Sequence, residues 1–349
     1  MFHTKLSHIF FLKICTKCNI LFLHLVHKYI TDTYFPQRWK SHMRAIRIHN
    51  FTEAPRREDI PVPDVGQNDV LVRVEATALN PLDALVASGV ARQFFDITMP
   101  ITLGTDFAGT IERVGAGVTQ WNAGDRVIAW VDAGSGGGLA DFAVTPAHAC
   151  VQLPENLSAT QGCAIPTAGI TAWHALFSCG RLKSHETVLI HAAAGGVGSF
   201  AVQFARMAGA RVIATASGSG LTLALGLGAD EVVDYRSQDF TRLAADVDMV
   251  LDLVGGETQS RSYKVLRAGG RLISTVMPPD EEEARAHGVT ASIFYAKPFA
   301  DRLGDLVATI ASRNVKVIID RAVPFDRFDE AWDYQIYGHA RGKIVVLSQ

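Results

Sequence analysis

The segment that most constrains the fold is "ETVLIHAAAGGVGSFAVQFARMAG" (186–209). Its first part is a short apolar, β-branched run, as in a buried strand. After Gly198 the apolar residues recur at helical spacing. Between the two, the spacing Ala193-x-Gly195-x-x-Gly198 matches a dinucleotide fingerprint except for its first glycine. Two interpretations are open: a loop that cradles a pyrophosphate, or a tight strand-to-helix turn without a ligand.

The rest of the chain shows two different patterns of predicted secondary structure. From about residue 163, apolar strands such as "ARVIATAS" alternate with helical spacers, which predicts βαβ units and a doubly wound parallel sheet over 163–296. Residues 43–162 show short alternating strands between turns, which predicts an antiparallel, barrel-like β unit. The tail, 297–349, contains a helix and two strands that we place back on the first unit. We therefore expect an α/β protein of two domains.

Residues 1–42 differ from the rest in composition. They contain six Lys and Arg against one Asp, and Lys13 and Lys17 interrupt their apolar stretch, which makes it a poor membrane span. We expect an unstructured extension, with an organelle-targeting peptide as the alternative. Cys15-x-x-Cys18 is a lone pair and indicates metal or redox chemistry only weakly.

The net charge and the cysteine content limit the expected partners and the cellular compartment. The net charge of −2 gives no indication of nucleic-acid or membrane binding. The remaining cysteines, Cys150, Cys163 and Cys179, are scattered in apolar surroundings and form no disulfide pattern, which fits a reducing compartment. We expect a cytoplasmic protein, unless residues 1–42 direct it to an organelle.

The context of the glycines favours the pyrophosphate interpretation. A strand precedes them at once and a helix follows, so the free N–H groups and the positive dipole end of the helix face the loop. Glycine lets the backbone approach the phosphates and lets the helix pack closely on the strand. The predicted cofactor-binding residues of this loop are Ala194, Gly195, Gly196, Val197 and Gly198.

The next strand indicates which dinucleotide is bound. An NAD site usually has an acidic residue about 20 positions on, bonded to the ribose 2′-hydroxyl. No Asp or Glu occurs between residues 199 and 229, which favours NADPH because a carboxylate would repel its 2′-phosphate. The candidate 2′-phosphate residues are Ser217, Ser219, Tyr235 and Arg236, unless these four are ordinary loop residues.

Several motifs in one order carry a family resemblance from Met43 to the C-terminus. The chain resembles the zinc-independent medium-chain dehydrogenase/reductases, in particular the NADPH:quinone oxidoreductase (zeta-crystallin-like) group. The resemblance implies a GroES-like catalytic domain, a Rossmann domain, NADPH in the cleft between them, and a homodimer. The motifs are "NPLD" (80–83), "GTDFAGTIERVGAGV", "GDRV", "PTAGITAWHAL", "HAAAGGVG" and "GHARGKIVV".

The same resemblance assigns expected roles. Asn80 would lie near the nicotinamide and the substrate carbonyl and could donate its amide to a developing enolate, although a structural Asx-turn is the alternative. Thr167 would contact the nicotinamide end, and the backbone of Val276, Phe294 and Tyr295 would bond the carboxamide. Arg341 and Lys343 are either cofactor contacts or charges of a C-terminal strand.

The resemblance also predicts that no metal takes part. Zinc-dependent relatives have Cys where Asn80 stands and His where Thr105 stands, and Cys163 alone cannot hold zinc. The expected reaction is hydride transfer from NADPH to a quinone or an α,β-unsaturated carbonyl. The chain departs from relatives at Leu85, where many have Tyr, and at Ser219, where many have Lys.

The sequence leaves two questions open, one about the segment 88–100 and one about the class of protein. The segment "SGVARQFFDITMP" (88–100) either forms a wall of the substrate cleft or belongs to the core. The alternatives to the reductase are a non-catalytic NADPH-binding protein and a zinc-type alcohol dehydrogenase.

Overall fold

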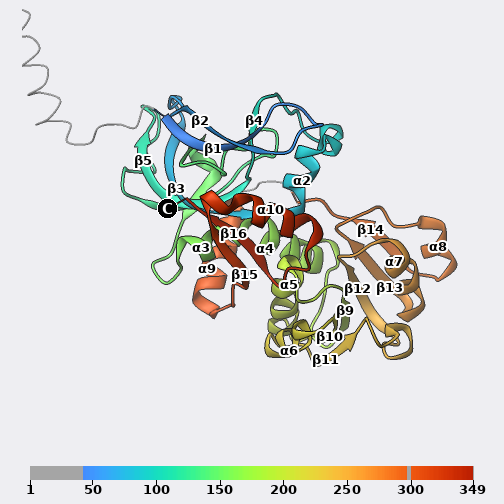
Figure 1. The fold of residues 1–349 in the computed structure, drawn as a ribbon. Helices are drawn as coiled ribbons and strands as arrows, with labels where there is room; N and C mark the ends of the chain where they lie inside the picture. The colour runs from blue at the N-terminus through green and yellow to red at the C-terminus, as the bar shows by residue number, and fades with distance from the viewer. Residues whose placement is uncertain (1–41, 297–299, 349) are drawn as a thin grey trace, which may run out of the picture. The chain divides into compact units, whose positions relative to one another are not determined.

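The structure, a computed structural model, describes residues 42–296 and 300–348 (Figure 1). The predicted extension over residues 1–42, apart from His42, and the Cys15–Cys18 pair lie outside these residues. No helix in the described part is both long and apolar enough to cross a bilayer.

The first part of the chain and two C-terminal strands together form two sheets dominated by antiparallel pairing. The larger is seven-stranded and has the order β15-β16-β3-β5-β6-β8, with β7 also paired to β3; the smaller has the order β2-β1-β4. The strands are β1 (His42–Ile48), β2 (Arg56–Pro61), β3 (Asp69–Leu79), β4 (Ile101–Thr102), β5 (Asp106–Val114), β6 (Arg126–Trp130), β7 (Phe142–Pro146), β8 (Cys150–Gln152), β15 (Ile319–Pro324) and β16 (Lys343–Leu347).

The middle of the chain forms a six-stranded sheet in which every pair is parallel. Its order, β11-β10-β9-β12-β13-β14, is that of a Rossmann fold, with the reversal between β9 and β12. The predicted doubly wound sheet is confirmed. Its strands are β9 (Thr187–Ile190), β10 (Arg211–Ala216), β11 (Glu231–Asp234), β12 (Val247–Asp252), β13 (Leu266–Ser274) and β14 (Thr290–Ile293).

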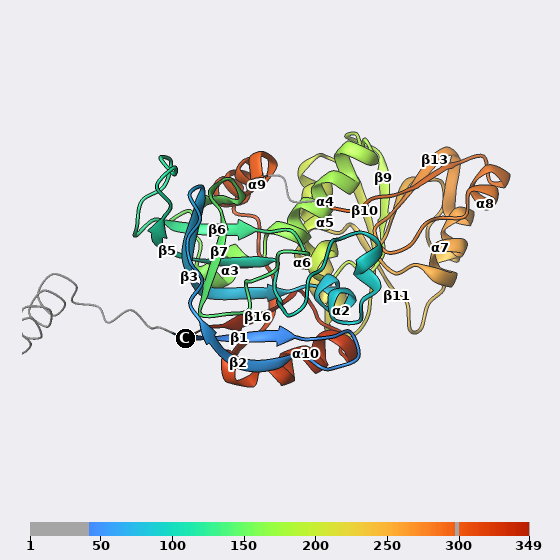
Figure 2. The same ribbon diagram turned by 90° about the horizontal axis from the view of Figure 1, so that it is seen from above.

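Alternate residues of these strands fill two different cores. Val188 and Ile190 of β9 belong to a cluster that includes Phe200 and Phe204, whereas Leu189 belongs to a cluster that includes Tyr263. A strand with period 2 and apolar residues on both faces requires helices on both sides. Figures 1 and 2 show α4 and α5 on one side of the sheet and α7 and α8 on the other.

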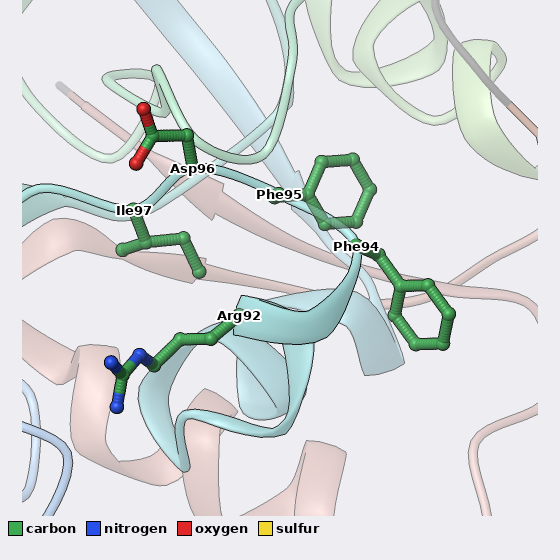
Figure 3. A pocket seen from close by; sticks show the side chains of 5 residues that line it. All are labelled: Arg92, Phe94, Phe95, Asp96 and Ile97. Atoms are coloured by element: carbon green, nitrogen blue, oxygen red, sulfur yellow. The ribbon is translucent and has the colours of Figure 1, made fainter.

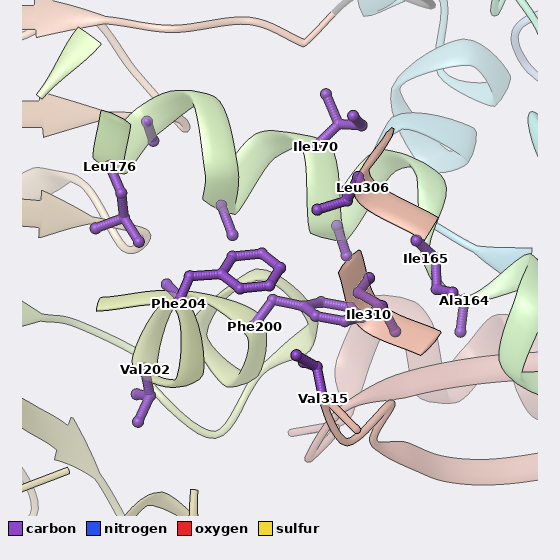
Figure 4. Packing of buried hydrophobic residues seen from close by; sticks show 14 of the residues in the cluster. Ala164, Ile165, Ile170, Leu176, Phe200, Val202, Phe204, Leu306, Ile310 and Val315 are labelled. Carbon is purple, nitrogen blue, oxygen red and sulfur yellow. The ribbon is translucent and has the colours of Figure 1, made fainter. Parts of the chain in front are cut away.

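The larger core joins the two sheets. Helix α4 packs between α5 and α9, where Phe200, Leu306 and Ile310 meet (Figure 4). The same cluster includes Ala76 of β3 and Ile128 of β6, so one core takes side chains from both predicted domains. The helices are α2 (Pro81–Ala87), α3 (Ala159–Cys163), α4 (Pro166–Trp173), α5 (Gly196–Met207), α6 (Ser219–Gly226), α7 (Gly256–Ser262), α8 (Glu281–Ala286), α9 (Ala300–Arg313) and α10 (Phe328–Tyr337).

The C-terminal strands return to the first sheet, as the sequence predicts. β16 runs antiparallel to β3 and pairs Ile344 with Leu79, and β15 runs parallel to β16. This register places Lys343 opposite the residue that follows Leu79. The domain boundaries at 162/163 and 296/297 stay a prediction.

Candidate nucleotide and substrate site

The glycine segment forms a tight turn from strand to helix. β9 ends at Ile190 and α5 begins at Gly196, two residues before the helix start that the sequence indicated. Ala192 has a φ of 48°, and a Cβ at Gly198 would lie 2.3 Å from the Ala192 carbonyl oxygen. No side chain fits there, so the close approach of helix and strand requires glycine at 198.

The start of α5 can receive an anion. The first N–H groups of a helix have no partner within it, and the positive end of the helix dipole lies at the same place. Gly195, Gly196 and Val197 are only half-buried, whereas Ala194 and Gly198 are buried beneath them. A twelve-residue helix with an accessible glycine start fits a pyrophosphate.

A cationic and hydroxyl-bearing group lies at the end of the neighbouring strand. The Ser217 hydroxyl, just after β10, donates to the Tyr235 hydroxyl oxygen at 2.9 Å. Arg341 comes from the loop before β16, and its Nη2 would be 3.3 Å from a Cβ at Gly218. In residues 42–296 and 300–348, no carboxylate pairs with the Arg341 guanidinium.

The other two candidates are chain neighbours of this group, Ser219 next to Gly218 and Arg236 next to Tyr235. Ser219 is the exposed first residue of α6. Arg236 is exposed, and its backbone N–H donates to Asp234 Oδ1 at 3.0 Å. The structure therefore brings together Ser217, Tyr235 and Arg341, and shows no bond from the side chains of Ser219 or Arg236 to them within the described residues.

Asn80 is the N-cap residue of α2, where it forms a capping box with Asp83, and it also belongs to a buried polar network. It is 2% exposed and precedes α2, where its backbone N–H donates to Asp83 Oδ2 at 2.7 Å. Its Oδ1 accepts a hydrogen bond from Lys343 Nζ, and its Nδ2 donates to Thr105 Oγ1 at 3.4 Å.

The network continues through Asp106 to Thr167. The Thr105 hydroxyl donates to Asp106 Oδ1 at 3.0 Å, and Thr167 donates its hydroxyl to the same oxygen at 2.7 Å and its N–H to Oδ2 at 2.9 Å. The Thr167 hydroxyl is thus a donor within the protein, and its oxygen retains only acceptor capacity for a ligand.

Burial shifts the charges of this network. Removal from water raises the pKa of Asp83 to about 6, an effect that its bonds from the N–H groups of Asn80 and Gly104 oppose. Burial also lowers the pKa of Lys343, against the attraction of Asp106 and Asp83. In this site, burial favours the neutral forms of Asp83 and Lys343, while the attraction between them favours the charged forms.

Sequence reasoning missed most of this network. The sequence assigns Asp83, Thr105 and Asp106 no part in this network, and it predicts Lys343 as either a cofactor contact or a charge of the C-terminal strand. The available signal was the sheet: once β16 is placed antiparallel to β3, "GKIVV" meets "TALN" and Lys343 stands opposite Asn80.

In the loops expected at the nicotinamide, some backbone N–H groups already donate hydrogen bonds within the protein. The Phe294 N–H donates to Ser274 O at 2.8 Å, so this N–H is already used within the protein. The Val276 N–H donates to Ser274 Oγ at 3.4 Å. The Phe294 ring stacks on His174, with centroids 5.5 Å apart.

The segment 88–100 divides between the two roles considered for it. Phe95 and Met99 pack on a buried cluster, whereas Phe94 is 60% exposed. The Phe94 ring meets the half-exposed Tyr295 ring at a centroid distance of 5.5 Å. A pocket of about 440 Å³ is lined by Arg92, Phe94, Phe95, Asp96 and Ile97. Figure 3 shows these five side chains.

The positions associated with zinc carry an amide, a hydroxyl and one thiol. Asn80 and Thr105 bond each other, and burial raises the pKa of the Cys163 thiol. Residues 42–296 and 300–348 contain no group of three His, Cys, Asp or Glu side chains that could hold a metal ion.

Two family models match different parts of the chain. Residues 66–155 match the alcohol dehydrogenase GroES-like domain, and residues 227–346 match the zinc-binding dehydrogenase family. The chloroplast envelope quinone oxidoreductase homolog of Arabidopsis thaliana is 35% identical over 302 residues, 82% of this chain and 92% of that protein.

Two further comparisons cover nearly all of the matched proteins. The quinone oxidoreductase of Rattus norvegicus is 32% identical over 325 residues, 87% of this chain and 98% of the rat protein. The solved quinone oxidoreductase of Coxiella burnetii superposes with a TM-score of 0.81 at 29% identity, over 88% of this chain and 100% of that one. The predicted pairing of a GroES-like and a Rossmann domain is confirmed.

Proposed function

The chain belongs to the quinone oxidoreductase family of the medium-chain dehydrogenase/reductases, and we propose that it uses NADPH to reduce a quinone or an α,β-unsaturated carbonyl without zinc. NADPH supplies the hydride in such a reaction. The protein's own residues bind the cofactor, orient the acceptor and receive the charge that develops on its carbonyl oxygen.

The observation that carries the NADPH assignment is the Ser217, Tyr235 and Arg341 group at the end of β10. Two hydroxyls and a guanidinium without a carboxylate partner in the described residues suit a dianionic 2′-phosphate. The N-terminus of α5, from Gly195 to Gly198, would hold the pyrophosphate. Thr167, Val276, Phe294 and Tyr295 are the proposed nicotinamide contacts, with Ser219 and Arg236 at the edge of the phosphate site.

Asn80 is the proposed donor to the acceptor carbonyl. Hydrogen-bond donors aimed at a developing oxyanion are worth most in a dry, preorganised site, and Asn80 is buried and held on both sides of its amide. An amide and a hydroxyl are poor zinc ligands, so this donor set fits a hydrogen-bonding role better than a metal-binding one.

The aromatic surface supports an apolar, flat acceptor. Phe94 and Tyr295 expose large ring faces that no core contact requires. Quinones and conjugated carbonyls are already polarised by conjugation and present a flat π-face to such rings.

The direct test is oxidation of NADPH with panels of quinones and enones. We expect turnover with at least one acceptor class and weaker binding of NADH than of NADPH. Tight NADPH binding without turnover of any acceptor would contradict the enzymatic proposal. That result would favour a non-catalytic NADPH-binding role, for which exposed Leu85, at the position of a relative's tyrosine, is the supporting feature.

We further propose a homodimer in the cytoplasm. The free thiols of Cys150, Cys163 and Cys179 suit a reducing compartment. Two relatives, from Arabidopsis thaliana and Spinacia oleracea, carry a chloroplast location in their names. Sedimentation of the purified protein tests the dimer, and a fluorescent fusion of residues 1–42 tests the location, with organelle import as the contrary result.

A further inference from the structure

Lys343 is a buried lysine at the start of β16, a strand whose other buried residues are apolar. It is 5% exposed, whereas the next residues of β16, Ile344 to Val346, are apolar and buried. Its Nζ donates to the Leu79 carbonyl oxygen at 2.6 Å and to Asn80 Oδ1. Burying an ammonium is costly, so its partners must compensate it.

The ammonium decides which way the Asn80 amide faces. Because Lys343 can only donate, the oxygen of the amide must lie on its side and the NH2 on the other. The Thr105 hydroxyl fits this order, since it gives its proton to Asp106 and accepts from Asn80 Nδ2. Without Lys343 the amide could rotate, because a hydroxyl can also donate to Oδ1.

The stem of Lys343 also reaches the nucleotide loop. A Cβ at Gly196 would lie 3.0 Å from Lys343 Cδ, so the methylene chain passes directly against the start of α5. Asn80 of one domain and the glycine turn of the other therefore share one side chain between them.

We propose that Lys343 is a positioning residue that orients the Asn80 amide, with Nδ2 as the donor to the acceptor carbonyl. The charge-assisted bond to Oδ1 also polarises the amide and strengthens its donor side. This inference rests on the proposed function, because it gives Asn80 the role of donor in that reaction.

The kinetic test is a double-mutant cycle. Lys343→Met keeps the stem against Gly196 and removes the donor and the charge. Since loss of one oxyanion donor costs about 100- to 1000-fold in kcat, we expect Lys343→Met to lower kcat about tenfold or more, with a smaller change in KM for NADPH. In an Asn80→Ala background, Lys343→Met should lower kcat only slightly further, because the amide that it orients is already absent. If the fold-losses in kcat of the two single variants multiply in the double variant, or if Lys343→Met leaves kcat unchanged, the proposal is overturned.

The matched control is Lys183→Met, at an exposed lysine, which should leave kcat unchanged.

A second readout needs neither cofactor nor turnover. In protein labelled with 15N-asparagine, the Asn80 side-chain NH2 signals are identified by their loss in Asn80→Ala. We expect Lys343→Met to shift both signals, and unchanged signals would refute the orientation. If Lys343→Met does not fold, Lys343→Met combined with Asp83→Asn removes a cation and a carboxylate together and serves for both measurements. A wild-type protein without turnover contradicts the proposed function, while the amide signals still decide the positioning.

Discussion

At the scale of single residues, Gly198 gives the sharpest prediction. A Cβ there would meet the backbone oxygen of Ala192 at 2.3 Å, which no rotamer change relieves. We expect Gly198→Ala to lower the free energy of unfolding by about 1–3 kcal/mol and to weaken NADPH binding, because α5 must move away from β9. Urea denaturation and fluorescence titration measure the two effects.

The control for this substitution is Gly226→Ala at the end of α6. A Cβ at Gly226 meets nothing within 4 Å, so this variant should keep wild-type stability and NADPH affinity. If the two alanine variants behave alike, the close approach of Gly198 to the turn is not a requirement of the fold.

In the proposed site, we expect Arg341 to determine the preference for NADPH over NADH. A hydrogen bond to a charged group contributes about 1.5–3 kcal/mol, so Arg341→Ala should raise the Kd for NADPH about 10- to 100-fold. The Kd for NADH should not change, because NADH has no 2′-phosphate. Arg313→Ala, an exposed arginine at the end of α9, controls for the loss of a surface charge. An equal loss for both nucleotides would remove Arg341 from the 2′-phosphate site.

At the scale of elements, we expect the contact between the loop after η1 (Val90–Gln93) and the loop after β14 to set the preference among acceptors. Phe94 and Tyr295 meet with ring centroids 5.5 Å apart, although each is about half-exposed or more. An aromatic pair contributes about 0.5–1.5 kcal/mol, so Phe94→Ala should raise KM for 1,4-naphthoquinone about two- to tenfold.

A small enone serves as the comparison for this variant. Methyl vinyl ketone has no ring to stack, so its KM should not change in Phe94→Ala. Tyr337→Ala, at a 79% exposed aromatic, should alter neither KM. A rise for both acceptors would indicate a general distortion of the loop instead of an aromatic contact.

The elements differ in how far the sequence predicts them. The β9–turn–α5 unit was predictable because its signals are local: a β-branched run, glycines, then helical spacing. The helix start was misplaced by two residues, because the sharp turn at Ala192 lets Gly196 enter the helix at once. The bond between Lys343 and Asn80 joins residues 263 positions apart and depends on the register of β16 on β3. No local pattern encodes that register, so the network around Asn80 became visible only in three dimensions.

At the scale of the whole molecule, two buried groups, one in α2 and one directly after β9, have opposite effects on acid stability. Burial raises the pKa of Asp83 to about 6 from an ordinary 3.8, and the nearby charge of Asp106 raises it further. The hydrogen bonds from the N–H groups of Asn80 and Gly104 and the charge of Lys343 lower the same pKa, but their effect is smaller. The folded state therefore binds the proton more tightly, and this group's contribution to stability falls as the pH rises from about 4 to about 6. His191, bonded to Thr215 and Ser262, behaves in the opposite way. Burial lowers its pKa to about 4 from 6.5, with Asp252 opposing and Arg261 adding to the effect.

The two contributions change in opposite directions over this pH range, and variants should separate them. The contribution of His191 rises with pH from about 4 to about 6.5, because only the unfolded chain takes up the proton there. Each change amounts to about 3 kcal/mol across its window. Relative to wild type, Asp83→Asn should therefore gain stability as the pH rises through this range, and His191→Gln should lose it. Urea denaturation at steps from pH 4 to 6.5 gives both differences, and subtraction from wild type removes the contribution of the other carboxylates. Two flat difference curves would mean that neither group changes its proton affinity on folding. Parallel slopes would mean that one of the two burial effects has the wrong sign.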